Sequence, residues 1–179
     1  MKDYRKKLSG IFVPLTTPFA DEKIVYPDLA ENVNRFNKTR LGGYMILGGN
    51  GEYLGLTEEE SLEVLKTVIK SKAGDKTAVA GCGRESAYAT VQFIKKAADT
   101  GAEFASIITP FYYSKLMGAE ALARYYEAIA DASPIPLVIY NSPEYAAGIM
   151  ISADTVSRLS GHPNIALMKN SSNESFSYL

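Results

Sequence analysis

Short apolar runs recur along the chain at intervals of about thirty residues, the length of one strand–helix–strand unit. Runs of four or five apolar residues bounded by turn residues indicate buried strands. We expect a strand in each of six runs, which are Ile11–Leu15, Tyr44–Leu47, Thr77–Ala80, Phe104–Ile108, Pro136–Tyr140 and Ile165–Met168. Strands that alternate with helices favour a parallel sheet.

Amphipathic segments with helix signals separate these runs. Pro27 fits the first position of one helix, and Thr57 with Glu60 forms a capping box at the start of the next. A third helix ends before Gly101, which fits the glycine position after a helix. Two further helices are expected, over 118–132 and 152–160. No linker, low-complexity segment or domain break is visible, so we expect a single domain over residues 1–179.

Two parallel folds fit this pattern, a doubly wound sheet and a (β/α)₈ barrel. A doubly wound fold usually carries a glycine-rich phosphate-binding turn after its first strand. Here that turn reads Thr16-Thr17-Pro18-Phe19 and contains no glycine. The turn therefore favours the barrel, although the pattern alone leaves both folds open.

Composition excludes several classes of function. The net charge is −1 with no basic block, so nucleic acid and anionic membranes are poor partners. Cys82 is the only cysteine and His162 the only histidine, so we expect neither a disulfide framework nor a metal site, and read both residues as structural. No apolar run approaches the roughly 18 residues of a membrane span, and the charged N-terminus does not resemble a signal peptide. We expect a cytoplasmic protein.

Polar residues gather where four of the predicted strands end. These are Gly48-Gly49-Asn50-Gly51-Glu52, Thr109-Pro110-Phe111-Tyr112-Tyr113, Tyr140-Asn141-Ser142-Pro143, and Lys169. In either parallel fold the chemistry lies at the C-terminal ends of the strands. We therefore expect a site formed by these four segments.

The residue types at these ends suit a reaction on a 2-oxo acid. An apolar environment disfavours the charged ammonium form of a lysine and so lowers its pKa, and the neutral amine can attack a ketone. The Gly48–Gly51 turn exposes successive backbone N–H groups that suit a carboxylate, and Tyr140 offers a proton-shuttling hydroxyl. Each also has a structural alternative: Lys169 as a solvated loop residue, the turn as a tight connection, and Tyr140 as a core side chain. Taken together they predict a Schiff-base enzyme.

The chain also resembles a known family, that of dihydrodipicolinate synthase and N-acetylneuraminate lyase, which are pyruvate-dependent class I aldolases. The markers, in family order from Gly10 onwards, are Thr16-Thr17-Pro18-Phe19, Gly48-x-x-Gly51-Glu52, Thr109-Pro110-x-Tyr112, Tyr140-Asn141-x-Pro143 and Lys169. Each marker is weak alone, but five in register are a strong signal.

The resemblance implies a (β/α)₈ barrel, assembled as a dimer or tetramer, that uses no cofactor. It implies that Lys169 forms the Schiff base, that Tyr140 shuttles protons, and that Tyr112 reaches into a neighbouring subunit's site. Within Gly48–Gly51, it implies that Gly49 and Asn50 hold the pyruvate carboxylate.

Three departures from the family pattern refine this interpretation. Gly49 lacks the hydroxyl group that relays protons in many family members. The Gly-x-Asn-Gly-Glu pattern that contains Asn50 is more similar to that of the 4-hydroxy-2-oxoglutarate aldolase branch. No arginine follows Pro143, where dihydrodipicolinate synthases hold an aldehyde carboxylate. The chain also carries about six of the eight units of a barrel, which needs roughly 250 residues.

We therefore expect a 4-hydroxy-2-oxo acid aldolase. The alternatives are a 4-hydroxy-tetrahydrodipicolinate synthase of lysine biosynthesis and a truncated, non-catalytic remnant. A sugar-phosphate barrel is disfavoured, because such phosphate sites usually follow strands seven and eight. We also expect the 179-residue chain by itself to have little activity and to self-associate.

Overall fold

The structure is a computed structural model that describes residue 4 and residues 6–173. The described residues form two compact units, which we treat separately. The N-terminal unit comprises residues 4, 6–81 and 96–103, and the C-terminal unit comprises residues 82–95 and 104–173. A single domain over residues 1–179 therefore stays a prediction.

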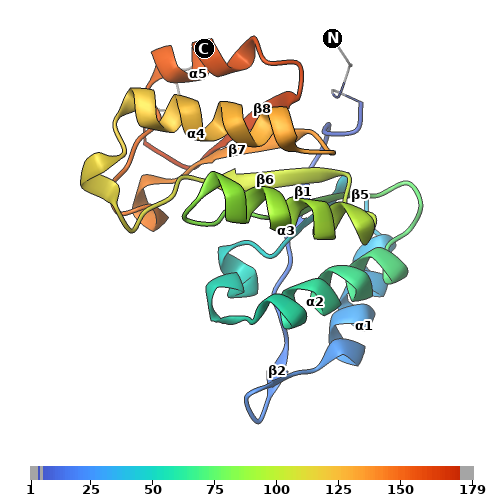
Figure 1. The fold of residues 1–179 in the computed structure, drawn as a ribbon. Helices are drawn as coiled ribbons and strands as arrows, with labels where there is room; N and C mark the ends of the chain where they lie inside the picture. The colour runs from blue at the N-terminus through green and yellow to red at the C-terminus, as the bar shows by residue number, and fades with distance from the viewer. Residues whose placement is uncertain (1–3, 5, 174–179) are drawn as a thin grey trace. The chain divides into compact units, whose positions relative to one another are not determined.

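The N-terminal unit holds three parallel strands in the order β1 (Phe12–Pro14), β4 (Gly43–Ile46) and β5 (Thr77–Gly81). A short antiparallel hairpin of β2 (Phe19–Ala20) and β3 (Lys23–Ile24) precedes α1 (Tyr26–Asn37). Two 3₁₀ turns, η1 (Gly49–Gly51) and η2 (Tyr53–Gly55), lead from β4 to α2 (Glu58–Ser71). Helices α1 and α2 lie side by side (Figure 1).

Local chemistry explains these elements. The Thr57 hydroxyl accepts a hydrogen bond from the Glu60 N–H, and the Glu60 carboxylate accepts one from the Thr57 N–H, which confirms the predicted capping box. Pro27 is the second residue of α1, one place after the predicted first position, and lies in the first turn. Gly43 is required where β4 meets β5, because a Cβ there would lie 2.1 Å from the Thr77 carbonyl oxygen.

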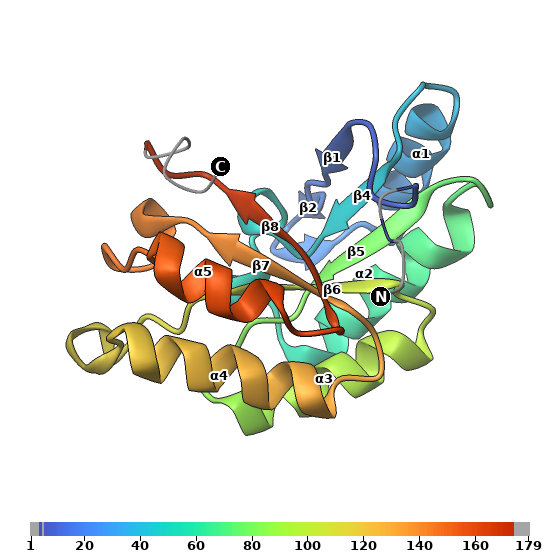
Figure 2. The ribbon, with the colours of Figure 1, turned by 90° about the horizontal axis from the view of Figure 1, so that it is seen from above.

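The C-terminal unit holds the parallel strands β6 (Phe104–Ile108), β7 (Leu137–Asn141) and β8 (Ile165–Asn170), in that order. Its helices are α4 (Ala119–Ala132), α5 (Ala153–Ser160) and the first part of α3 (Ala87–Asp99), and its 3₁₀ turns are η3 (Ser114–Leu116) and η4 (Pro143–Tyr145). Both views show α4 and α5 side by side (Figures 1 and 2). Arg158 of α5 forms ion pairs with Glu120 and Glu127 of α4, each at 2.7 Å.

The six predicted strands are confirmed, with ends that differ by at most two residues and with the bounds of β6 unchanged. The largest change is in β8, which continues to Asn170 because Lys169 and Asn170 pair with Tyr140 and Asn141 of β7. Lys169 therefore lies within the last strand and not just beyond it. The β2–β3 hairpin and the 3₁₀ turns were not predicted. In the described part of the chain, no helix combines the length and apolar character needed to cross a membrane.

Candidate active site

Tyr140 and Lys169 face each other across neighbouring strands of the C-terminal unit. The register pairs Tyr140 of β7 with Lys169 of β8, and Lys169 Nζ lies 3.5 Å from the centroid of the Tyr140 ring. Paired residues on adjacent parallel strands point to the same face of the sheet, and both side chains are half-buried. An ammonium group over a tyrosine ring is a cation–π contact. The structure thus brings together two of the residues that the sequence singled out.

Two serines share the face of this pair. Ser142 and Ser171 each lie two residues beyond Tyr140 and Lys169, and side chains two apart on extended backbone point the same way. Burial raises the pKa of Tyr140, but the Lys169 ammonium and the hydroxyls of Ser142 and Ser171 outweigh it, so the pKa of the phenol is lowered. A phenol with a lowered pKa exchanges its proton more readily near neutral pH.

The opposite face of the same strands holds an amide ladder. Asn141 Nδ2 donates to Asn170 Oδ1 at 2.9 Å, and Asn141 Oδ1 accepts from the Ile151 N–H at 3.1 Å. Asn170 Oδ1 also accepts from the Ser172 N–H at 3.1 Å. These bonds fix the register of β7 against β8 at the level of Lys169, and so support the Tyr140–Lys169 contact.

The predicted carboxylate-binding turn, Gly48–Gly51, lies in the N-terminal unit. It forms the 3₁₀ turn η1, in which the Gly51 N–H bonds to the Gly48 carbonyl and the Glu52 N–H bonds to the Gly49 carbonyl, each at 3.0 Å. Among the described residues, the N–H groups of Gly48, Gly49 and Asn50 have no such partner. The Thr17 hydroxyl donates to the Gly51 carbonyl at 2.8 Å and fixes the turn. Three backbone donors are therefore free to bind an anion, one fewer than the four residues of the predicted nest.

Tyr112 lies in the loop between β6 and η3, and its side chain is 74% exposed. Its ring packs edge-to-face on Tyr113, with the ring centroids 4.9 Å apart. The Glu85 carboxylate accepts hydrogen bonds from the backbone N–H groups of Phe111 at 3.2 Å and Tyr112 at 2.9 Å. Glu85 therefore holds this loop in place. This role could not be predicted from the sequence, because Glu85 precedes Phe111 and Tyr112 by 26 and 27 residues along the chain.

The segment after β7, where the sequence shows no arginine, forms η4 and then turns at Ala147 and Gly148. Both of these residues have positive φ, 50° and 80°. The three arginines of the described C-terminal unit are engaged elsewhere. Arg84 stacks on Phe93 at 3.9 Å, Arg124 pairs with Glu120 at 2.7 Å, and Arg158 pairs with Glu120 and Glu127.

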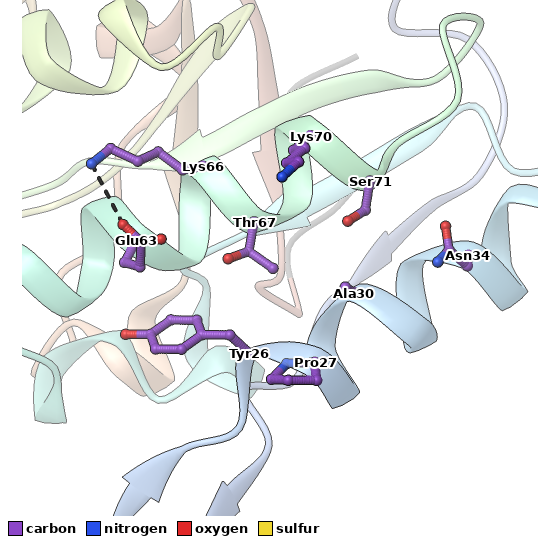
Figure 3. A pocket seen from close by; sticks show the side chains of 9 residues that line it. All are labelled: Tyr26, Pro27, Ala30, Asn34, Glu63, Lys66, Thr67, Lys70 and Ser71. Carbon is purple, nitrogen blue, oxygen red and sulfur yellow. Dashed lines mark hydrogen bonds and ion pairs between the residues drawn. The ribbon is translucent and has the colours of Figure 1, made fainter.

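A separate hollow of about 530 Å³ lies between α1 and α2 in the N-terminal unit (Figure 3). Its lining residues are Tyr26, Pro27, Ala30, Asn34, Glu63, Lys66, Thr67, Lys70 and Ser71. None of the predicted site residues lines it, and its lysines project from a helix and not from a strand end. Lys66 Nζ also lies 3.5 Å from Glu63 Oε2. This hollow does not offer the lysine–tyrosine chemistry described above.

His162 and Cys82 have structural surroundings, as predicted. His162 bonds to Asp131 at 3.1 Å and to the Asn164 N–H at 3.1 Å, which fixes the turn before β8. Cys82 is fully buried, and burial raises the pKa of its thiol to about 12, with a small opposing effect from Arg84. Within the described residues, no three acidic, histidine or cysteine side chains form a group that could hold a metal ion.

Comparison with known proteins finds a family model that matches nearly all of the chain, and several relatives. Residues 7–178 match the dihydrodipicolinate synthetase family. The chain is 32% identical over 163 residues to an L-threo-3-deoxy-hexylosonate aldolase from Aspergillus niger, covering 87% of this chain and 49% of that protein. It is 36% identical over 165 residues to a 4-hydroxy-tetrahydrodipicolinate synthase from Thermomicrobium roseum, covering 92% of this chain and 54% of that protein.

The solved structures agree with this likeness. The crystal structure of a chloride-inhibited dihydrodipicolinate synthase from Acinetobacter baumannii, complexed with pyruvate, matches 90% of this chain with a TM-score of 0.82 and 32% sequence identity, and the match covers 55% of that chain. The fold is thus of the (β/α)₈-barrel type with about six of the eight units, and the chain spans about half the length of the relatives it matches. The predicted family is confirmed: the chain belongs to the dihydrodipicolinate synthetase family.

Proposed function

We propose that the protein is a class I aldolase or lyase in which Lys169 forms a Schiff base with pyruvate or a related 2-oxo acid. The observation that carries this proposal is the position of Lys169 Nζ, 3.5 Å above the ring of Tyr140, whose phenol has a lowered pKa. A lysine that must attack a ketone, beside a group that must move protons, is the arrangement this chemistry needs.

The reaction proceeds in balanced steps. The Lys169 amine adds to the keto carbon to give a carbinolamine, which loses water with a proton from Tyr140 to give the protonated imine. Tyr140 then takes the proton of the substrate's 4-hydroxyl group. The bond between C3 and C4 breaks, an aldehyde leaves, and the electron pair moves into the imine to form an enamine. Protonation at C3 and hydrolysis release pyruvate and restore the amine.

The remaining site residues have supporting roles in this proposal. The backbone N–H groups of Gly49 and Asn50, in the turn bounded by Gly48 and Gly51, bind the substrate carboxylate. Tyr112 completes the site of a second subunit, which makes the active form a dimer or tetramer. Its 74% exposure supports this role, because a large exposed aromatic residue is typical of an interface. No cofactor is needed, since the imine itself accepts the electron pair. A cytoplasmic location stays a prediction.

We propose a 4-hydroxy-2-oxo acid as the preferred substrate. A bidentate arginine is the usual way to hold a second carboxylate, and none follows Pro143. Glu144 and Tyr145 occupy that segment instead, and Glu144 would repel an anionic aldehyde. The likeness to the Aspergillus niger aldolase supports this choice.

The second candidate is the synthase of the lysine pathway, which the likeness to the Thermomicrobium roseum protein supports. It is distinguished by condensation of pyruvate with aspartate semialdehyde. Efficient condensation that free lysine inhibits would favour it over cleavage of 4-hydroxy-2-oxo acids.

Borohydride trapping with pyruvate, followed by peptide mass spectrometry, tests the Schiff base directly. We expect the label on Lys169 and on no other lysine, and no label in Lys169→Ala. The helix-surface variant Lys66→Ala is the matched control and should label as the parent does. Label spread over several lysines, or absent from the parent, would contradict the proposal and favour a non-catalytic remnant.

A further inference from the structure

We infer that Ser142 is a positioning residue that donates a hydrogen bond to the Tyr140 oxygen while that oxygen gives and takes its proton, a role that rests on the proposed function. Its hydroxyl group would orient the phenol towards the reacting atoms and stabilise the phenolate formed in each proton transfer. Ser142 itself stays unchanged by the reaction and acts only through Tyr140.

The first support is burial without a partner. The Ser142 side chain is 1% exposed, and its Oγ makes no hydrogen bond of good geometry to any described group. A buried hydroxyl without a partner costs free energy, so it is normally retained for a reason. A hydrogen bond formed only when the phenol loses its proton is such a reason.

The second support is direction. Ser142 follows Tyr140 by two residues, and its φ of −147° continues the extended backbone of β7, so both side chains point to the face that carries Lys169. Among the residues that the structure describes, two other buried side-chain polar atoms lack a partner, Thr109 Oγ1 and Asn170 Nδ2. The same alternation places these two on the opposite face. Among the three, only Ser142 shares the face of the reacting pair.

The third support is proximity. Burial raises the pKa of the Tyr140 phenol, but Lys169 and the hydroxyls of Ser142 and Ser171 lower it. The Ser142 hydroxyl is therefore close enough to Tyr140 to interact with the phenol oxygen.

Few groups compete for control of Tyr140. On β8 the charged group that acts on it is Lys169, and the β6 residue paired with it is Ile108, which is apolar. Ser142 and Ser171 do not titrate in this range. A shift in the titration of Tyr140 on changing Ser142 can therefore be assigned to the lost hydroxyl.

The test follows the rate of imine formation against pH. The 179-residue chain is mixed with pyruvate and cyanoborohydride, and labelled Lys169 is counted by mass spectrometry over time. The variants are Ser142→Ala, Ser142→Thr and Ser142→Val, of which threonine and valine have nearly the same shape and differ in the hydroxyl. Circular dichroism checks that each variant is folded.

Dehydration of the carbinolamine uses the protonated phenol, so the rate falls as pH rises through the pKa of Tyr140. Losing a donor to the phenolate raises this pKa. We expect the falling limb of the alanine and valine variants to move to higher pH by about one unit, with labelling roughly tenfold slower at neutral pH because the phenol is a weaker acid. The threonine variant should follow the parent over the whole pH range.

The inference would be overturned if the pH–rate profiles of the alanine and valine variants coincided with that of the parent. It would also be overturned if the profiles of the threonine and valine variants were displaced equally. A parent that is not labelled would instead overturn the proposed function, and with it this inference. The two failures are thus distinguished by the parent alone.

Discussion

At the residue scale, the ring and the hydroxyl of Tyr140 have separate tasks. The ring lies under the Lys169 ammonium, and in the proposed mechanism the hydroxyl exchanges protons. Tyr140→Phe keeps the first and removes the second. We expect it to slow imine formation with pyruvate by about 10²–10⁴-fold, the usual contribution of a proton shuttle, with little loss of stability. Timed borohydride trapping measures the rate, and Tyr113→Phe is the control. An unchanged rate would assign the proton transfer to another group.

Gly49 is a second residue whose surroundings allow a clean test. A Cβ built there meets no atom within 4 Å, and its φ is not in the left-handed region. Gly49→Ser should change the free energy of unfolding by no more than about 0.5 kcal/mol.

The contrasting variant is Gly43→Ala, whose Cβ would lie 2.1 Å from the Thr77 carbonyl oxygen. Such overpacking costs about 1–3 kcal/mol or more. Denaturant unfolding measures both variants. A Gly49→Ser chain as unstable as Gly43→Ala would show that the turn has no room for a side chain.

The sequence could predict Lys169 and Tyr140 because each stands at the polar end of an apolar run. It could not predict Ser142 or Glu85. An unpartnered hydroxyl is visible only once its neighbours are placed, and Glu85 reaches the Tyr112 loop from a segment 27 residues earlier.

At the scale of elements, the loop after β6 depends on one side chain. The Glu85 carboxylate accepts from two successive N–H groups, and such charge-assisted bonds are stronger than neutral ones. Because Glu85 is exposed, we expect Glu85→Gln to weaken the local structure by only about 1 kcal/mol.

Hydrogen exchange should accordingly rise several-fold at Phe111 and Tyr112, while β6 stays protected. Glu144→Gln, which changes another exposed glutamate in the same unit, is the control and should leave exchange at these two residues unchanged. Equal exchange in Glu85→Gln and the parent would show that the loop is held by its own packing.

The long elements were predictable and the short ones were not. A five-residue strand such as β6 is visible in the sequence as a continuous apolar run, and a capping box marks the start of α2. The strands β2 and β3 have two residues each, too few to show an alternation of apolar and polar positions. The turn that connects them contains no glycine. Asp21 and Glu22 occupy it and adopt positive φ values of 47° and 61°. Sequence rules look for glycine or asparagine at such positions, so the hairpin was missed.

At the scale of the whole molecule, β8 pairs with β7 on one side, and the described residues provide no strand on its other side. Leu167 of β8 is 36% exposed. Open strand edges and exposed apolar side chains favour association. We expect the 179-residue chain to elute from a sizing column as oligomers whose size grows with concentration. Leu167→Lys should reduce this association. A parent that stays monomeric and unfolds cooperatively would contradict the prediction.

The buried thiol of Cys82 reports how often the segment around it opens. It is the only cysteine, it is fully buried, and burial raises the pKa of the thiol to about 12, so a thiol reagent reacts only when the surrounding segment opens. The labelling rate therefore counts openings of the C-terminal unit, which also carries Lys169. A 2-oxo acid that binds only the closed form should slow the labelling of Cys82 by a factor set by the ratio of its concentration to its Kd. It should not slow labelling in Lys169→Ala. Ligand binding to the 179-residue chain thus becomes measurable without an assay of turnover.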